Sequence, residues 1–195
     1  MQVTYENVTS NKVKDSFDSV LQAYEALHEY TIILKQKPIR GSTMQAQPII
    51  SPISLFNGVK RYQVSLAHHV RDSEEIRVEE LPKEVLVGWF AHELGHLVDY
   101  TAYSNWGMVR YGLRYLQSEK FRRQAEHHAD YLAIAHGFHQ EILATKRFIL
   151  SHDLLDEGYK AKIRKYYLSA EEVELCVAGK TPIPPTVRLP GSHSE

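Results

Sequence analysis

The sequence of 195 residues lacks several features that would assign it to a common class of protein. Its single cysteine, Cys176, excludes an internal disulfide. No run of about 20 apolar residues is present that could span a bilayer. The 23 Lys and Arg residues almost balance the 24 Asp and Glu residues, with a formal net charge of -1. Nucleic-acid-binding proteins usually carry a basic surplus or stripe, so we expect no nucleic-acid partner.

The first ten residues, MQVTYENVTS, are polar and lack the apolar core of a signal peptide. We therefore expect a soluble, cytoplasmic protein. Hydrophobic residues make up 43% of the chain and charged residues 24%, which is typical of a globular protein of one domain. We expect this domain to cover residues 1–180 and the Pro- and Ser-containing residues 181–195 to form a flexible tail.

Helical spacing of apolar residues predicts a first helix over residues 13–28. Segments rich in β-branched and aromatic residues then predict strands over 30–37 and 43–50, and a further one over 53–56 before the turn pair Asn57-Gly58. In residues 61–68, three apolar side chains alternate with more polar ones, as in a half-buried strand: Tyr62, Val64 and Leu66. We expect these short strands to form an antiparallel sheet.

The second half of the chain is predicted to be helical. Helices are expected over 82–100, 105–116, 118–136, 139–151 and 159–167. Ser169 and Glu172 have the spacing of a capping box, which predicts a last helix that Gly179 closes. A helix, then a sheet, then a group of helices is the order of an α+β domain.

The helix expected over 82–100 contains His-Glu-x-x-His, from His92 to His96. Residues four apart on a helix lie about 40° apart around its axis, so His92 and His96 can direct two imidazoles at one zinc ion. Glu93 is rotated about 100° from His92, which places its carboxylate beside the metal, where a general base must stand. The same five-residue pattern also arises by chance on buried helices, so a third ligand has to be found elsewhere.

A catalytic zinc ion takes three protein ligands and leaves one position open. One longer pattern, His-Glu-x-x-His-x-x-Gly-x-x-His, is excluded, because Asp99 and Ala102 stand where it requires Gly and His. Asp99 shares a face with the two histidines, but it lies about 4.5 Å beyond His96 along the helix axis. Its side chain is too short to reach well, and a role beside the site or at a solvated helix end is the simpler interpretation.

The segment EHHAD, from Glu126 to Asp130, offers a stronger third ligand. Its two acids share one helix face, while the two histidines between them are rotated about 100° and 200° away from Glu126. Glu126 can complete the metal site, and Asp130 can accept the free N–H of a liganding histidine. The alternative is that Glu126 forms an ordinary ion pair with Arg122 or Arg123.

Together, His92-Glu-Leu-Gly-His96 and Glu126-x-x-Ala-Asp130 resemble the motifs of the gluzincin branch of zinc metallopeptidases. The second motif is most similar to that of the prenyl-protein (CAAX) and heat-shock membrane endopeptidases and their small soluble relatives. The resemblance covers roughly residues 85–136. This chain differs from the membrane members of that group in having no transmembrane segment.

The resemblance implies a zincin-like fold, in which the active-site helix packs with the glutamate helix under a small mixed sheet. The edge strand of that sheet lies over the cleft and pairs with an extended substrate. We take Arg61–His68 as this strand, with Tyr62, Val64 and Leu66 as its substrate-binding residues.

The resemblance also implies roles for the motif residues: His92, His96 and Glu126 as zinc ligands, Glu93 as general base and Asp130 as hydrogen-bond partner of a ligand. It implies an endopeptidase that hydrolyses a peptide or protein substrate with a zinc-activated water. A donor to the oxyanion is also expected. Four C-terminal side chains are candidates between which the sequence does not choose: His152, Tyr159, Tyr166 and Tyr167.

Two other interpretations remain open. A zincin-fold binding or regulatory protein would hold a structural or vestigial zinc ion, and a fixed fourth protein ligand would favour it. A basic surface could also contact an acidic partner, although a solvated helix face is the simpler explanation. Its residues would be Arg110, Arg114, Lys120, Arg122 and Arg123.

Overall fold

The computed structural model describes residues 2–50, 61–71 and 73–181. The strand predicted over 53–56, the turn pair Asn57-Gly58 and the tail from residue 182 lie outside the described residues. The elements in chain order are β1 (Gln2–Glu6), α1 (Asn11–Ala23), β2 (Thr31–Gln36), β3 (Met44–Pro48), β4 (Arg61–Leu66), α3 (Lys83–Thr101), α4 (Asn105–Gln117), α5 (Glu119–Ala135), α6 (His139–Ser151), α7 (Glu157–Tyr166) and α8 (Ala170–Val177). The predicted α+β class is confirmed.

The four strands form one mixed sheet in the order β1-β2-β4-β3. β1, β2 and β4 run parallel, and only β3 is antiparallel to its neighbour. The antiparallel sheet that we expected from the strand patterns is therefore wrong. It failed because β1, which we did not predict, precedes α1 and pairs with β2 after it, so that the helix connects two parallel strands.

The prediction that Arg61–His68 is the edge strand is also wrong. β4 lies between β2 and β3, and the edge strand nearest the helices is β3. The side chains of Tyr62, Val64 and Leu66 are 2%, 0% and 0% exposed, because they pack into the hydrophobic core, which also includes residues of α1 and α3. These three residues therefore cannot line a cleft. Because they are buried on an inner strand, their predicted role in substrate binding is wrong as well.

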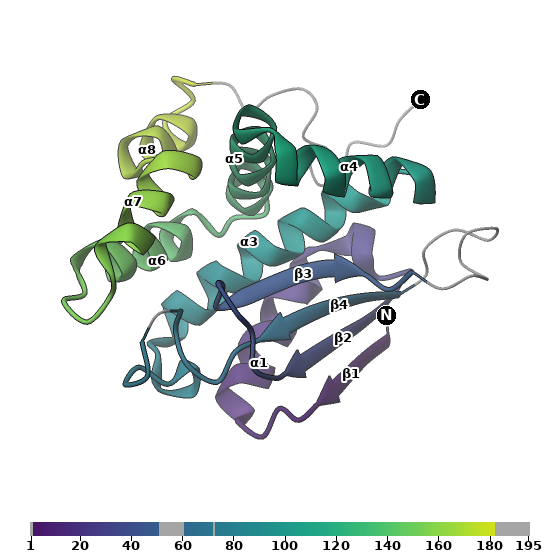
Figure 1. The fold of residues 1–195 in the computed structure, drawn as a ribbon, viewed down its shortest axis with the longest axis horizontal. Helices are drawn as coiled ribbons and strands as arrows, with labels where there is room; N and C mark the ends of the chain where they lie inside the picture. Colours follow the sequence, from purple (N-terminus) through teal and green to yellow (C-terminus); the bar gives the residue numbers. More distant parts are fainter. Residues whose placement is uncertain (1, 51–60, 72, 182–195) are drawn as a thin grey trace.

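Helix α3 runs through the middle of the molecule, between the sheet with α1 on one side and the C-terminal helices on the other (Figure 1). On the α1 side, Phe17 meets Phe90 edge to face with ring centroids 5.2 Å apart. The buried hydroxyl of Tyr24 donates to the carbonyl oxygen of Ala91 at 2.7 Å. Because α3 is covered on both sides, almost all of its residues from Val85 to Val98 are buried.

The helix ends follow the capping residues of the sequence. Ser104, Ser118 and Asp156 cap α4, α5 and α7, and Ser169 forms the predicted capping box with Glu172. Gly137 follows α5 with φ of 90°, a conformation that favours glycine. The helices predicted after residue 82 are confirmed within about two residues at each end. The first helix is shorter than predicted, because the chain turns into a 3₁₀ segment at Glu25–Leu27.

Two glycines let α3 approach its neighbours closely. A Cβ atom added at Gly88 would overlap the carbonyl oxygen of Glu141 and the hydroxyl of Thr145 on α6. One added at Gly95 would lie 2.8 Å from the carbonyl oxygen of Ala129 on α5. Gly95 stands between the two histidines of the motif, so this close approach brings α5 up to the metal-binding face of α3.

Substituting Gly88→Ala should destabilise the protein by roughly 1–3 kcal/mol, because the added methyl group overpacks the contact with α6. Gly112→Ala is the matched control, since a Cβ there meets nothing within 4 Å on α4. It should stabilise the protein by about 0.5–1 kcal/mol through helix propensity. Urea unfolding of both variants measures the difference, and equal changes at the two positions would contradict the packing argument.

Candidate metal centre

His92 and His96 of α3 converge with Glu126 of α5 in a buried cluster. The Nε2 atoms of the two histidines are 3.1 Å apart. Glu126 Oε2 lies 3.0 Å from Nε2 of His92 and 3.3 Å from Nε2 of His96. Ligands bound to zinc at 2.0–2.1 Å in a tetrahedron are separated by about 3.4 Å. The three atoms thus lie close to the spacing of three corners of such a tetrahedron, and the group could hold a metal ion.

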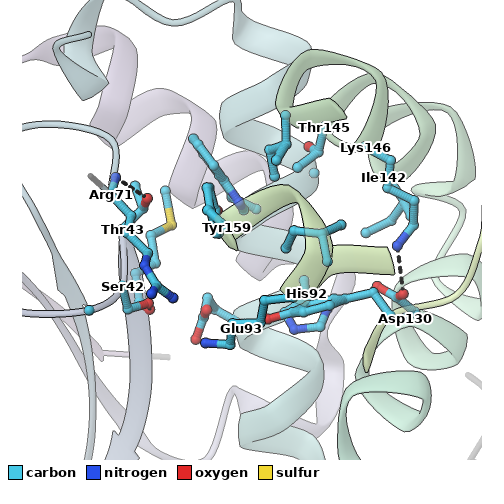
Figure 2. A pocket seen from close by; sticks show the side chains of 18 residues that line it. Ser42, Thr43, Arg71, His92, Glu93, Asp130, Ile142, Thr145, Lys146 and Tyr159 are labelled. Carbon is cyan, nitrogen blue, oxygen red and sulfur yellow. Dashed lines mark hydrogen bonds and ion pairs between the residues drawn. The ribbon is translucent and has the colours of Figure 1, made fainter. Parts of the chain in front are cut away.

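Asp130 fixes the orientation of His92. Its Oδ1 atom lies 2.9 Å from His92 Nδ1, so an N–H at Nδ1 leaves Nε2 directed at the cluster. Its Oδ2 atom accepts hydrogen bonds from Lys146 Nζ at 2.8 Å and from the backbone N–H of Leu168 at 3.0 Å. Figure 2 shows Lys146 and Asp130 joined in this way beside His92.

Glu126 is held from the other side by α4. The hydroxyl of Tyr115 donates to Glu126 Oε1, which leaves Oε2 for the two histidines. The ring of Tyr100 stacks near that of His96, with centroids 6.1 Å apart and planes at 20°. Within the described part of the chain, His96 Nδ1 is buried without a hydrogen-bond partner. Asp130 therefore holds the orientation of His92 through its Nδ1 atom, whereas no described residue holds the Nδ1 atom of His96.

Two ionised carboxylates lie in the cluster beside the histidines. Burial opposes ionisation of Asp130, but Lys146 and His92 outweigh it and lower its pKa to about 2. Burial also opposes ionisation of Glu126, but His96 and His92 outweigh this effect and hold the pKa of Glu126 well below its usual range. Burial disfavours a charged His92, yet Asp130 and Glu126 raise its pKa to about 10. The charge that holds a proton there would equally favour a metal cation.

Glu93 is partly exposed and stands outside this group of three. Burial raises the pKa of Glu93, while His96, His92 and a hydrogen bond from the backbone of Ala46 act to lower it. Glu93 is therefore placed between the metal-binding histidines and the edge strand β3. A carboxylate whose pKa is raised toward neutrality in this position can accept and return a proton.

A cavity with a water-accessible volume of about 50 Å³ opens beside His92 and Glu93. Figure 2 shows Glu93 facing it, with Ser42, Thr43 and Arg71 on the side away from His92. The apolar part of its lining comes from β3 and three helices: Met44, Trp89, Ile142, Ile149 and Ile163. Polar groups line the remainder, among them Tyr159 and Tyr167.

Two residues of the site were not assigned a place in it by the sequence, and a third was only one of several candidates. Lys146 is one, although its position on the apolar stripe of α6, between Ile142 and Ile149, could have marked it as a buried cation. Tyr115 carried no such signal, because its role depends on how α4 packs against α5. Tyr167 was one of four candidates, and its ring lies 5.1 Å from that of His92.

Other candidate residues lie elsewhere. Asp99 pairs with His128 through Oδ1 and Nδ1 atoms 3.1 Å apart and is not part of the metal-binding group. The hydroxyl of Tyr166 donates to Glu119 at 3.3 Å. His152 packs against Phe148, with ring centroids 4.9 Å apart.

Substituting Lys146→Met should destabilise the protein by roughly 3–5 kcal/mol, because it leaves Asp130 buried without its cation. Lys165→Met is the control: Lys165 makes a comparable ion pair with Glu119, at 2.7 Å, but both side chains are more than half exposed. Solvent screens that pair, so its loss should matter far less. Urea unfolding at neutral pH compares the two, and equal stability of the variants would show that the buried pair does not support the site.

The wider comparisons give no relative from which a role could be transferred. No family model, no curated protein and no solved structure matches this chain.

Proposed function

We propose that this protein is a zinc-dependent metallopeptidase that hydrolyses peptide bonds. The observation that carries the proposal is the buried triangle of two histidine Nε2 atoms and one Glu126 oxygen, with sides of 3.0, 3.1 and 3.3 Å. Glu93 and an open cavity lie beside it. This combination supports catalysis more than a purely structural metal site.

Two imidazoles and one carboxylate form a ligand set typical of catalytic zinc sites. Among the described residues, no fourth metal-binding side chain belongs to this group. That supports an open position for water and favours an enzyme over a binding protein with a closed site. When bound there, zinc would supply Lewis acidity that activates a water molecule and polarises the scissile carbonyl.

Glu93 acts as the proton carrier in this proposal. Its carboxylate removes a proton from the attacking water as the new carbon–oxygen bond forms. As the carbon–nitrogen bond breaks, Glu93 returns the proton to the leaving nitrogen, giving an amine and a carboxylic acid. The hydrogen bond from Ala46 and the neighbouring imidazoles of His92 and His96 support its position.

Tyr167 is the best-placed donor to the oxyanion. It lines the cavity beside His92. Burial, with the nearby charges of Glu126 and Glu93, keeps the pKa of its hydroxyl well above the usual value. The hydroxyl therefore stays protonated at neutral pH and can donate a hydrogen bond to developing negative charge.

The edge strand β3 supports an extended substrate. Thr43 accepts a hydrogen bond from Ala67, and Ile49 donates one to Arg61, so the backbone groups of these two residues, which flank β3, face β4. Backbone groups alternate in direction along a strand, so those of Met44 and Ala46 face away from the sheet. The N–H of Ala46 already donates to Glu93, and the carbonyl oxygen of Met44 accepts from Ser42, which leaves the N–H of Met44 and the carbonyl oxygen of Ala46 for a substrate. A substrate added alongside would pair with them, and the small, partly apolar cavity would accept an apolar side chain.

The first test is the metal content of purified protein and its ability to cleave a diverse peptide library. Zinc at one ion per chain with discrete cleavage is expected. Protein that is fully loaded with zinc and cleaves no peptide would contradict a peptidase and favour the binding protein.

Two substitutions should separate metal binding from chemistry. Glu93→Gln should keep zinc bound and lower kcat/KM for a cleaved library peptide by roughly 10²–10⁴-fold, because the proton carrier is lost. Glu126→Ala should instead weaken zinc binding, by at least the roughly 10–100-fold that loss of an outer partner costs. Zinc titration and peptide kinetics measure both, and full hydrolysis by the Glu93 variant would disprove the mechanism.

Tyr167→Phe should lower kcat by roughly 10²–10³-fold with zinc content unchanged, because it removes the donor to the oxyanion. Tyr166→Phe is the control, because the neighbouring hydroxyl bonds to Glu119. It should retain the wild-type kcat. Equal kcat values for the two variants would exclude Tyr167 as the donor.

A further inference from the structure

Helix α4 exposes an unusual number of large apolar side chains. Trp106 and Leu116 are each 72% exposed, Leu113 is 52% exposed and Val109 is 40% exposed. The inner face of α4 is already used, because Met108 and Tyr111 are buried against the rest of the protein. The outer side chains are therefore not part of the core.

These four side chains form one continuous stripe. At 100° per residue, Trp106, Val109, Leu113 and Leu116 fall within an arc of about 80° around the helix axis. Arg110 and Arg114 follow on one flank, about 40° and 80° beyond Trp106. Both arginines are exposed, and α4 contains no acidic residue. The outer face of α4 thus combines an apolar stripe with a band of positive charge.

We propose that this face of α4 binds the surface of an anionic lipid bilayer. A helix with tryptophan and leucine on one side and arginine beside them suits the boundary between headgroups and acyl chains. The apolar stripe would enter the boundary, while the arginines would meet lipid phosphates or carboxylates. The 13 residues of α4 rise only about 20 Å, less than the hydrocarbon core, so the helix lies on the bilayer.

The charge of the face argues against a second copy of this chain as its partner. Two α4 helices packed stripe to stripe would offer no acidic residue of α4 to pair with Arg110 and Arg114 of the other copy. No helix of the described residues is long and apolar enough to cross a membrane. The proposal stands whether or not the metal centre is catalytic.

Binding at this face would also affect the metal centre, because the opposite side of α4 contacts one of the metal-binding residues. Tyr115, on the inner side of α4, donates to Glu126. Attachment of the outer face would hold the helix in place while its inner face supports a metal-binding residue. Trp106 is an exposed member of the stripe, so its fluorescence would report contact with lipid directly.

Tryptophan fluorescence of the full chain, with vesicles of phosphatidylcholine alone or mixed with phosphatidylglycerol, tests the proposal. The chain has two tryptophans, and Trp89 is only 8% exposed. Anionic vesicles should shift the emission of Trp106 to shorter wavelength, neutral vesicles should bind at least tenfold more weakly, and added salt should weaken anionic binding. No shift with anionic vesicles at low salt would overturn the proposal.

Variants of single positions locate the binding face. Leu116→Ser and Arg110→Gln should each weaken binding to anionic vesicles at least threefold. The controls are Leu154→Ser, which removes a leucine that is 50% exposed outside α4, and Arg147→Gln, which removes an exposed arginine of α6. Both should bind as the wild type does. Equal loss in test and control variants, or a fluorescence shift with an acidic amphipathic peptide but not with vesicles, would refute the bilayer as partner.

Discussion

The site depends on one buried carboxylate. An ionised Asp130 in the interior costs several kcal/mol unless its oxygens are fully paired. Three groups from different parts of the chain do this: the imidazole of His92 on α3, the ammonium of Lys146 on α6 and the backbone N–H of Leu168 after α7. A displacement of any of these elements would leave a charge uncompensated, so Asp130 ties three helical segments to the orientation of one imidazole.

This constraint explains why α3 is covered on both sides. The sheet and α1 pack on one side of it through aromatic contacts such as Phe17 with Phe90. On the other side, α5 and α6 must come close enough to deliver Glu126, Asp130 and Lys146. The missing Cβ atoms of Gly88 and Gly95 permit that approach. A wider helix spacing would leave the carboxylates too far from the histidines to interact with them.

The sequence was sufficient for features set by local periodicity and capping. The helices from α3 onward, the capping box at Ser169 and the shared face of His92 and His96 follow from spacing along single helices. Glu126 was named from a second motif, and its approach to the two histidines depends on how α5 packs against α3. Features set by packing between elements could not be found this way. The alternation of β4 showed a strand but not its neighbours, and both of its edges are paired, with β2 and β3. The short strand β1 was missed although Val3 and Tyr5 alternate with polar residues, because an alternation over only five residues is a weak signal on its own.

The short distances between the three ligand atoms of the metal centre require a positive charge among them. If each imidazole carries its proton on Nδ1, two nitrogen lone pairs and a carboxylate oxygen point at one another across 3.0–3.3 Å. Three acceptors cannot satisfy one another, so a proton or a cation has to lie among them. Asp130 holds His92 in that tautomer and thereby turns its Nε2 toward the shared position. A metal ion that binds there competes with a proton, and its affinity must therefore rise as the pH increases.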